Sequence, residues 1–168
     1  MTVHYIGQHA HLGQLYIDGL ELYRKGGQKP GASTGWACVD QHYTVAPGQW
    51  TVVTGFPGSG KSEWLDAMLV NLAEADPEWF FAVYSPENCP TVNHLVKLIE
   101  KRVRKPFSPG KHERMTEQEY ADGALWVMEH FLWLETELKT PDELIRAALS
   151  FDMTGRKMGV VLDPWNRL

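Results

Sequence analysis

Apolar and polar positions follow one another along the chain in blocks that predict strands and helices in turn. The run 50–54 is short and rich in β-branched residues, and Trp79–Tyr84 is apolar throughout. Continuous apolar runs of this length are typical of strands covered on both faces. Two later runs, 131–135 and 158–162, have the same character. Segments with apolar residues at helical spacing separate them, at 63–75, 90–103, 116–130 and 140–151.

Strands that alternate with helices predict an α/β fold with a mainly parallel sheet flanked by helices. Two of the predicted helices have clear start signals. Thr116 is followed by Glu119, and Thr140 by Pro141 and Glu143, which are the spacings of capping boxes. In such a fold the ligand site is expected at the carboxyl ends of the strands.

The first part of the chain has a different pattern. Residues 1–13 show no clear period, so we expect them to be extended or mobile. Residues 15–23 suit a short amphipathic helix, which ends at the Arg-Lys-Gly-Gly sequence 24–27. A loop rich in Gly and Pro follows. We therefore predict an N-terminal extension with a linker helix over 1–34 and a compact domain over 35–168.

Composition narrows the class of protein. The chain has 168 residues, of which 43% are hydrophobic and 22% charged, which suits one soluble globular domain. The net charge of −5 indicates that any contact with DNA comes from a local patch or from other parts of a longer protein. The sequence shows neither an apolar run of membrane-spanning length nor a signal peptide. Cys38 and Cys89 need not pair, so we expect a cytoplasmic protein.

One glycine-rich segment carries specific chemistry. It follows a predicted strand, precedes a predicted helix and fits the phosphate-binding pattern G-x-x-x-x-G-K-[ST], called Walker A. Its glycines permit a backbone whose N–H groups converge on a phosphate, and the helix that follows adds a partial positive charge. The Lys side chain reaches the β- and γ-phosphates and the Ser hydroxyl suits Mg²⁺. The predicted nucleotide-binding residues are Gly55, Phe56, Pro57, Gly58, Ser59, Gly60, Lys61 and Ser62.

Two carboxylates follow predicted strands. Asp163 ends the apolar strand 159–162, where an Asp of a phosphate-loop enzyme holds the Mg²⁺ shell. Glu87 lies three residues after Tyr84, and Pro86 restricts the backbone between them. A carboxylate there could accept a proton from the water that attacks the γ-phosphate. Position alone leaves a second interpretation equally open, in which Glu87 is a solvated charge ahead of a helix.

Three segments together resemble the RecA-like motor domain of ring helicases of the DnaB and Twinkle kind. They are the phosphate-binding segment 53–62, the Tyr-Ser-Pro-Glu-Asn sequence 84–88 and the Leu-Asp-Pro-Trp-Asn sequence 162–166, in the order of the family. The start of that domain is also resembled by three short upstream segments, 34–36, 39–40 and 46–48. The resemblance covers roughly residues 15–168.

The resemblance implies that Glu87 is the catalytic glutamate, with Lys61 also contributing to catalysis. It implies that Lys61 binds phosphate and that Ser62 and Asp163 hold Mg²⁺. The cofactors would be ATP and Mg²⁺. The partners would be single-stranded DNA and further copies of the chain, in a hexameric ring that acts in DNA replication in a bacterial or phage-infected cell. In the family the helix 15–23 packs on a neighbouring subunit, although a helix folded back on its own domain is equally compatible with the sequence.

The sequence stops at Leu168, five residues after Asp163. Motor domains of the family continue with a further strand, DNA-contacting loops, a phosphate-sensing glutamine and an arginine finger. We therefore interpret the chain as a motor domain truncated after the second carboxylate motif. Since an arginine finger can supply about 10³ to 10⁵ in rate, we expect nucleotide binding with little or no turnover from these residues alone.

Three other classes of protein stay open. A phosphate-loop nucleotide kinase would need an arginine-rich lid, for which 102–114 is a poor candidate. A RecA-type recombinase or clock-type ATPase would share the same core. A nucleotide-gated interaction protein would bind ATP without hydrolysing it.

The basic stretch 97–114 could contact a phosphate backbone. Its interrupting acids make a solvated helix face the better interpretation. The histidines show no metal-ligand spacing. Among the tryptophans, Trp126 and Trp133 are predicted to lie in the core, and packing is also the favoured role for Trp36 and Trp165.

Overall fold

The computed structural model describes residues 10–26, 31–88, 90–134, 140–151 and 155–164. The chain divides into two compact units, Met1–Gly31 and Ala32–Leu168. The first unit contains helix α1 (Ala10–Gly26), which confirms the predicted helix and extends it at both ends. Its Ile17 and Leu20 side chains are exposed.

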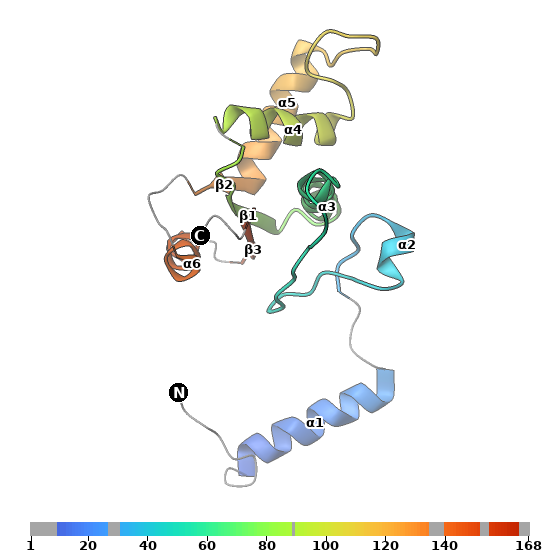
Figure 1. The fold of residues 1–168 in the computed structure, drawn as a ribbon. Helices are drawn as coiled ribbons and strands as arrows, with labels where there is room; N and C mark the ends of the chain where they lie inside the picture. The colour runs from blue at the N-terminus through green and yellow to red at the C-terminus, as the bar shows by residue number, and fades with distance from the viewer. Residues whose placement is uncertain (1–9, 27–30, 89, 135–139, 152–154, 165–168) are drawn as a thin grey trace. The chain divides into compact units, whose positions relative to one another are not determined.

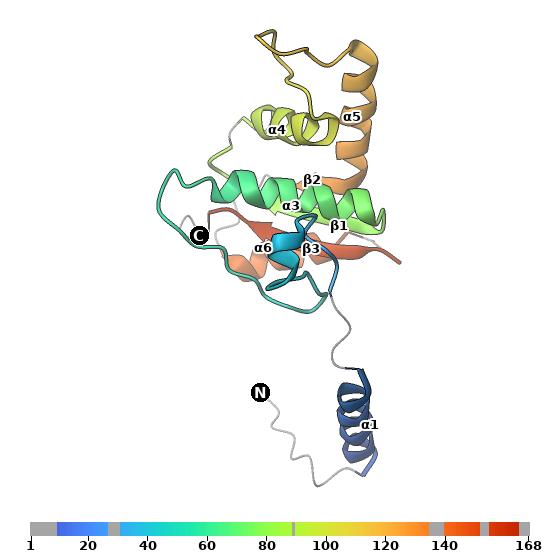
Figure 2. The same ribbon diagram turned by 90° about the vertical axis from the view of Figure 1, so that its right-hand side faces the viewer.

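The second unit is built on three parallel strands. They are β1 (Trp79–Tyr84), β2 (Phe131–Trp133) and β3 (Lys157–Leu162), in the order β2-β1-β3. In the register, Phe81 lies opposite Phe131 on one side and Gly159 on the other. All three strands were predicted, so the α/β fold with a parallel sheet is confirmed, and Figures 1 and 2 show helices on both faces of it.

The two faces of the sheet are covered by different helices. Trp79, Phe81 and Val83 of β1 point to the side of α3 (Lys61–Ala75), α4 (Val92–Val103) and α5 (Glu117–His130). Ala82 faces α6 (Pro141–Leu149), where Leu144 and Ala148 are completely buried. Side chains of a strand alternate between its faces, so an apolar run such as β1 requires cover on both.

The helix starts follow the sequence signals. The Thr116 and Thr140 hydroxyls accept hydrogen bonds from the Glu119 and Glu143 amides, and both glutamates accept in return from the threonine amides. Both predicted capping boxes are therefore confirmed. Within the sheet, a Cβ atom at Gly159 would lie 2.6 Å from the Phe81 ring, which explains a glycine in the middle of β3.

One predicted strand is wrong. Residues 50–54 form no strand in the described part of the chain, and Trp50 and Val52 are 65% and 72% exposed. A strand requires hydrogen bonds to a neighbouring strand, whereas a cleft of about 650 Å³ separates this segment from β3. The sequence also did not predict the short helix α2 (Ala37–Asp40) or the antiparallel bridge between Ala32 and Val45.

Candidate nucleotide-binding site

The glycine-rich segment lies directly at the start of α3. Gly58 and Gly60 have φ of 74° and 82°, left-handed values that favour glycine, and a Cβ atom at either would meet only open space. Gly60 is the N-cap residue, so no side chain at this position competes for the first N–H groups of the helix. The loop is therefore shaped for close approach of a ligand to its backbone.

Lys61 is the first residue of α3, and its ammonium lies over the loop. Its Nζ atom donates to the carbonyl oxygens of Gly55 and Phe56, at 3.0 and 2.9 Å. Ser62 follows on the helix. All ten residues from 51 to 60 are exposed, so the positive charge of Lys61 and the helix N-terminus meet at an accessible place.

A segment before the loop supports α3 from the side. The Asn71 side-chain amide donates to the Thr34 carbonyl at 2.9 Å, and the Trp36 and Trp64 rings stack at 5.8 Å. Asp40 accepts hydrogen bonds from the hydroxyl groups of Ser33 and Thr34, which lower the pKa of the Asp40 carboxyl group. The contacts of Asn71 and Trp64 therefore tie the helix that carries Lys61 to this segment.

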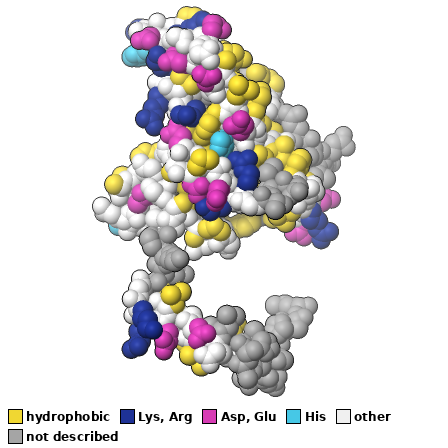
Figure 3. Space-filling model, turned by 180° about the vertical axis from the view of Figure 1, so that it is seen from behind, with side chains coloured by type: hydrophobic (Ala, Val, Ile, Leu, Met, Phe, Trp, Pro, Cys, Tyr) yellow, Lys and Arg dark blue, Asp and Glu magenta, His cyan; other side chains and the backbone are white. Residues whose placement is uncertain are grey.

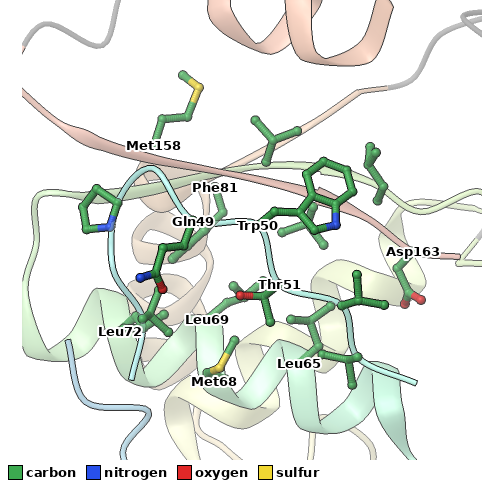
Figure 4. A pocket seen from close by; sticks show the side chains of 18 of the residues that line it. Gln49, Trp50, Thr51, Leu65, Met68, Leu69, Leu72, Phe81, Met158 and Asp163 are labelled. Carbon is green, nitrogen blue, oxygen red and sulfur yellow. The ribbon is translucent and has the colours of Figure 1, made fainter. Parts of the chain in front are cut away.

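Asp163 lies directly after β3, at the carboxyl edge of the sheet. Its amide donates to the Tyr84 carbonyl at 2.9 Å, which joins the ends of β3 and β1. Asp163 and Lys61 line the same cleft. Figure 4 shows Asp163 at the end of β3, on the same side of the strand as the segment that carries Trp50 and Thr51. The fold thus places the lysine and this carboxylate in the lining of one cleft.

The cleft itself is mostly apolar. Segment 43–53 forms one wall, α3 contributes a second and β3 a third, with Leu65, Met68 and Leu69 of α3 among the lining residues. The polar groups of Lys61 and Asp163 lie in its lining, so a polar ligand would meet them where the strands end.

Glu87 belongs to a tight turn that follows β1. The Asn88 amide donates to the Ser85 carbonyl at 3.1 Å, and the Asn88 side chain donates to the Ser85 hydroxyl at 2.9 Å. The turn starts beside Asp163, because Tyr84 is hydrogen-bonded to it. Glu87 therefore lies at the same edge of the sheet, with an exposed side chain.

The basic stretch is largely paired with acids. Lys97 and Lys101 contact Glu63, Arg102 and Arg104 contact Glu74, and Lys105 contacts Glu113 and Glu119. On the face shown in Figure 3, Lys and Arg side chains lie interspersed with Asp and Glu. This pairing favours the solvated helix face over a separate basic field for nucleic acid.

Other predicted features have mixed outcomes. Trp126 and Trp133 are partly buried and pack against the core, and Trp36 packs on Trp64. Cys38 is exposed, while Cys89 and Trp165 lie outside the described residues. Among the described His, Cys, Asp and Glu side chains, no group of three or more could hold a metal ion. No helix in the described ranges is long and apolar enough to cross a membrane.

Sequence comparison finds similarity to a plant protein. The chain is 38% identical over 162 residues to the Twinkle homolog protein, chloroplastic/mitochondrial, of Arabidopsis thaliana. This chain is similar to a Twinkle homolog. The match covers 91% of the chain but 23% of that protein, so the chain spans about a quarter of the relative's length. No family model matches the chain, and no solved structure matches it.

The predicted likeness to Twinkle proteins is therefore supported over most of the chain, while the limits of the motor domain stay a prediction. The structure places Lys61 and Asp163 in the lining of one cleft. Ser62 follows Lys61 on α3, and the turn of Glu87 begins after Tyr84, which is hydrogen-bonded to Asp163. Sequence reasoning missed the residues that connect α3 to that turn, above all Lys97. The sequence did contain a signal for this contact: Lys97 is spaced from His94 and Lys101 so that all three share one face of α4.

Proposed function

We propose that this chain is the ATP-binding part of a DNA helicase motor domain, in which ATP hydrolysis drives movement along single-stranded DNA in the complete protein. The observation that carries the proposal is the shared cleft of Lys61, which starts α3 after a phosphate-binding sequence, and Asp163, which ends β3. The similarity to a Twinkle homolog supports the helicase class.

The residues present fit a nucleoside triphosphate. The Lys61 ammonium, which donates to two loop carbonyls, would donate to the β- and γ-phosphate oxygens instead. The uncapped N–H groups at the start of α3 and the open backbone at Gly58 and Gly60 add further donors. Gly55 to Ser62 would thus cradle the phosphates.

The residues also fit a magnesium ion. The Ser62 hydroxyl and the Asp163 carboxylate offer the oxygen ligands that Mg²⁺ prefers, and the phosphates would complete the set. When bound, Mg²⁺ would offset negative charge on the β- and γ-phosphates.

Glu87 would orient the attacking water and accept its proton. Its place in the turn after β1, at the edge that carries Asp163, supports this role. The complete ring would contribute an arginine finger and loops that contact DNA, so we expect strong turnover of the complete protein.

The first experiment measures binding of ATP and Mg²⁺ by isothermal titration calorimetry. We expect binding by the unmodified protein, its loss in Lys61→Ala, and retention in Lys111→Ala, which removes an exposed lysine of the 105–115 loop. Equal affinity of the Lys61→Ala variant and the unmodified protein would refute the nucleotide site.

The second experiment uses the complete protein. We expect single-stranded DNA to stimulate ATP hydrolysis, a forked DNA duplex to be unwound, and Glu87→Gln to lower hydrolysis by about 100-fold with binding retained. Phosphate transfer to a nucleoside monophosphate would instead indicate a kinase. ATP binding without hydrolysis at any protein concentration would indicate a nucleotide-gated interaction protein.

A further inference from the structure

Helices α3 and α4 face each other with opposite charges. Glu63 and Asp66 are three residues apart on α3, and His94, Lys97 and Lys101 repeat at helical spacing on α4. Glu63 contacts both lysines, and the His94 Nε2 atom lies 3.0 Å from Asp66 Oδ1. Because Glu63 directly follows Ser62, this interface begins at the phosphate-binding loop.

Lys97 is the member of the interface that also reaches the turn after β1. Its Nζ atom lies 3.1 Å from Glu63 Oε1 and donates to Asn88 Oδ1 at 3.1 Å. Asn88 in turn donates to the Ser85 hydroxyl at 2.9 Å. One ammonium group therefore connects the first turn of α3 to the residues on either side of Glu87.

A second set of hydrogen bonds, through His94, also joins the two helices. The Trp133 indole donates to His94 Nδ1 at 3.2 Å, so Nδ1 acts as the acceptor and Nε2 carries the hydrogen that meets Asp66. His94 and Asp66 are only 2% and 5% exposed. These hydrogen bonds join α3, α4 and β2. They hold α4 against α3 one helical turn from Lys97.

We infer that Lys97 is a positioning residue, which sets Glu87 relative to the phosphate-binding loop by bridging Glu63 and Asn88. The inference rests on the proposed function for its catalytic consequence. The bridge itself is a property of the protein without nucleotide, because all its contacts are between protein side chains.

The first test is therefore made without nucleotide. Lys97→Met removes the ammonium and keeps most of the side-chain length, and Lys111→Met is the matched control. We expect amide exchange at Asn88, measured by NMR, to rise about tenfold in Lys97→Met, with Val83 of β1 unchanged and the melting temperature close to that of the unmodified protein. Unchanged exchange at Asn88 would overturn the bridge, whatever the protein does with ATP.

The second test measures hydrolysis by the complete protein. A small displacement of a reacting group can cost up to about 100-fold in rate, so we expect kcat to fall about tenfold in Lys97→Met with KM for ATP within twofold. Lys97→Arg should recover most of the rate, because it keeps the charge. Asn88→Ala should lower kcat similarly, and the double variant no further.

The outcomes separate the two proposals. If the unmodified protein binds and hydrolyses ATP but Lys97→Met keeps its kcat, the positioning role is wrong and the nucleotide site stands. If the unmodified protein does not bind ATP, the proposed function is wrong, and with it the catalytic consequence of the bridge. A parallel rise in KM and loss of thermal stability in Lys97→Met would indicate a merely structural lysine.

Discussion

Segment 50–54 and strand β1 resemble each other in sequence and differ completely in structure. Both begin with Trp and contain β-branched or aromatic residues, yet Trp79 is 4% exposed and Trp50 is 65% exposed. Strand β1 pairs with a strand on each side and has helices on both faces. Segment 50–54 pairs with no strand in the described part of the chain. An apolar run becomes a strand only where neighbours complete its hydrogen bonds and cover its faces.

The difference matters for the proposed function, because the exposed segment leads into the predicted phosphate-binding loop. The packed region fixes Asp163 and the turn of Glu87 through the hydrogen bond between Asp163 and Tyr84. The loop is instead held from its carboxyl side, by α3 and the contacts of Asn71 and Trp64. One half of the candidate site is thus set by the sheet and the other by a helix.

The test with the largest expected effect on stability replaces a phenylalanine in each region. Phe81 is 2% exposed at the centre of the sheet, so Phe81→Ala should lower the free energy of unfolding by about 3–5 kcal/mol. Phe56 is 87% exposed, and Phe56→Ala should change it by less than about 0.5 kcal/mol. Urea unfolding followed by circular dichroism measures both. Similar losses in the two variants would show that segment 50–56 is packed.

A test with a smaller expected effect replaces the same residue type, valine, in both regions. Val83 of β1 is 2% exposed and Val52 is 72% exposed. Removing two buried methyl groups in Val83→Ala should lower the free energy of unfolding by about 2 kcal/mol. Val52→Ala should leave it within about 0.5 kcal/mol of the unmodified value. The same unfolding assay applies, and a large loss in Val52→Ala would place that side chain in a core.

The next test concerns helix capping, with an expected change in the free energy of unfolding about half as large. The Thr116 hydroxyl accepts from the Glu119 amide at the start of α5, so Thr116→Ala should lower the free energy of unfolding by about 1 kcal/mol. Thr54→Ala, in the exposed segment, serves as the control and should have almost no effect. Thermal unfolding of the two variants checks this, and equal melting temperatures would contradict a stabilising cap.

The smallest expected effect is the pH dependence of the interface between α3 and α4. Hydrogen bonding to Lys101, and to a lesser degree Lys97, lowers the pKa of Glu63 below its ordinary 4.5, although partial burial opposes the shift. A lowered pKa in the folded state gives stability that is present above pH 4.5 and is lost as the pH falls through the lowered value.

The measurement compares the unmodified protein with Glu63→Gln by urea unfolding at pH 7 and pH 3. Because the Glu63 side chain is 53% exposed, we expect a difference below about 1 kcal/mol at pH 7 that shrinks at pH 3 and in high salt. A difference that grows on acidification would contradict the sign of the shift.

The sequence alone determined much of this protein. Continuous apolar runs predicted all three strands of the sheet, and the Thr and Glu spacing predicted both capping boxes, because these signals act over a few neighbouring residues. The phosphate-binding pattern predicted roles for Lys61 and Ser62 for the same reason.

The tertiary structure decided what depends on distant neighbours. Whether 50–54 forms a strand depends on β3, more than a hundred residues away in the chain, and the cleft between them separates the two. The bridge from Glu63 through Lys97 to Asn88 joins three elements whose approach no local pattern encodes. Side-chain chemistry can be read along the chain, but the distances that make it a site arise only when the chain folds.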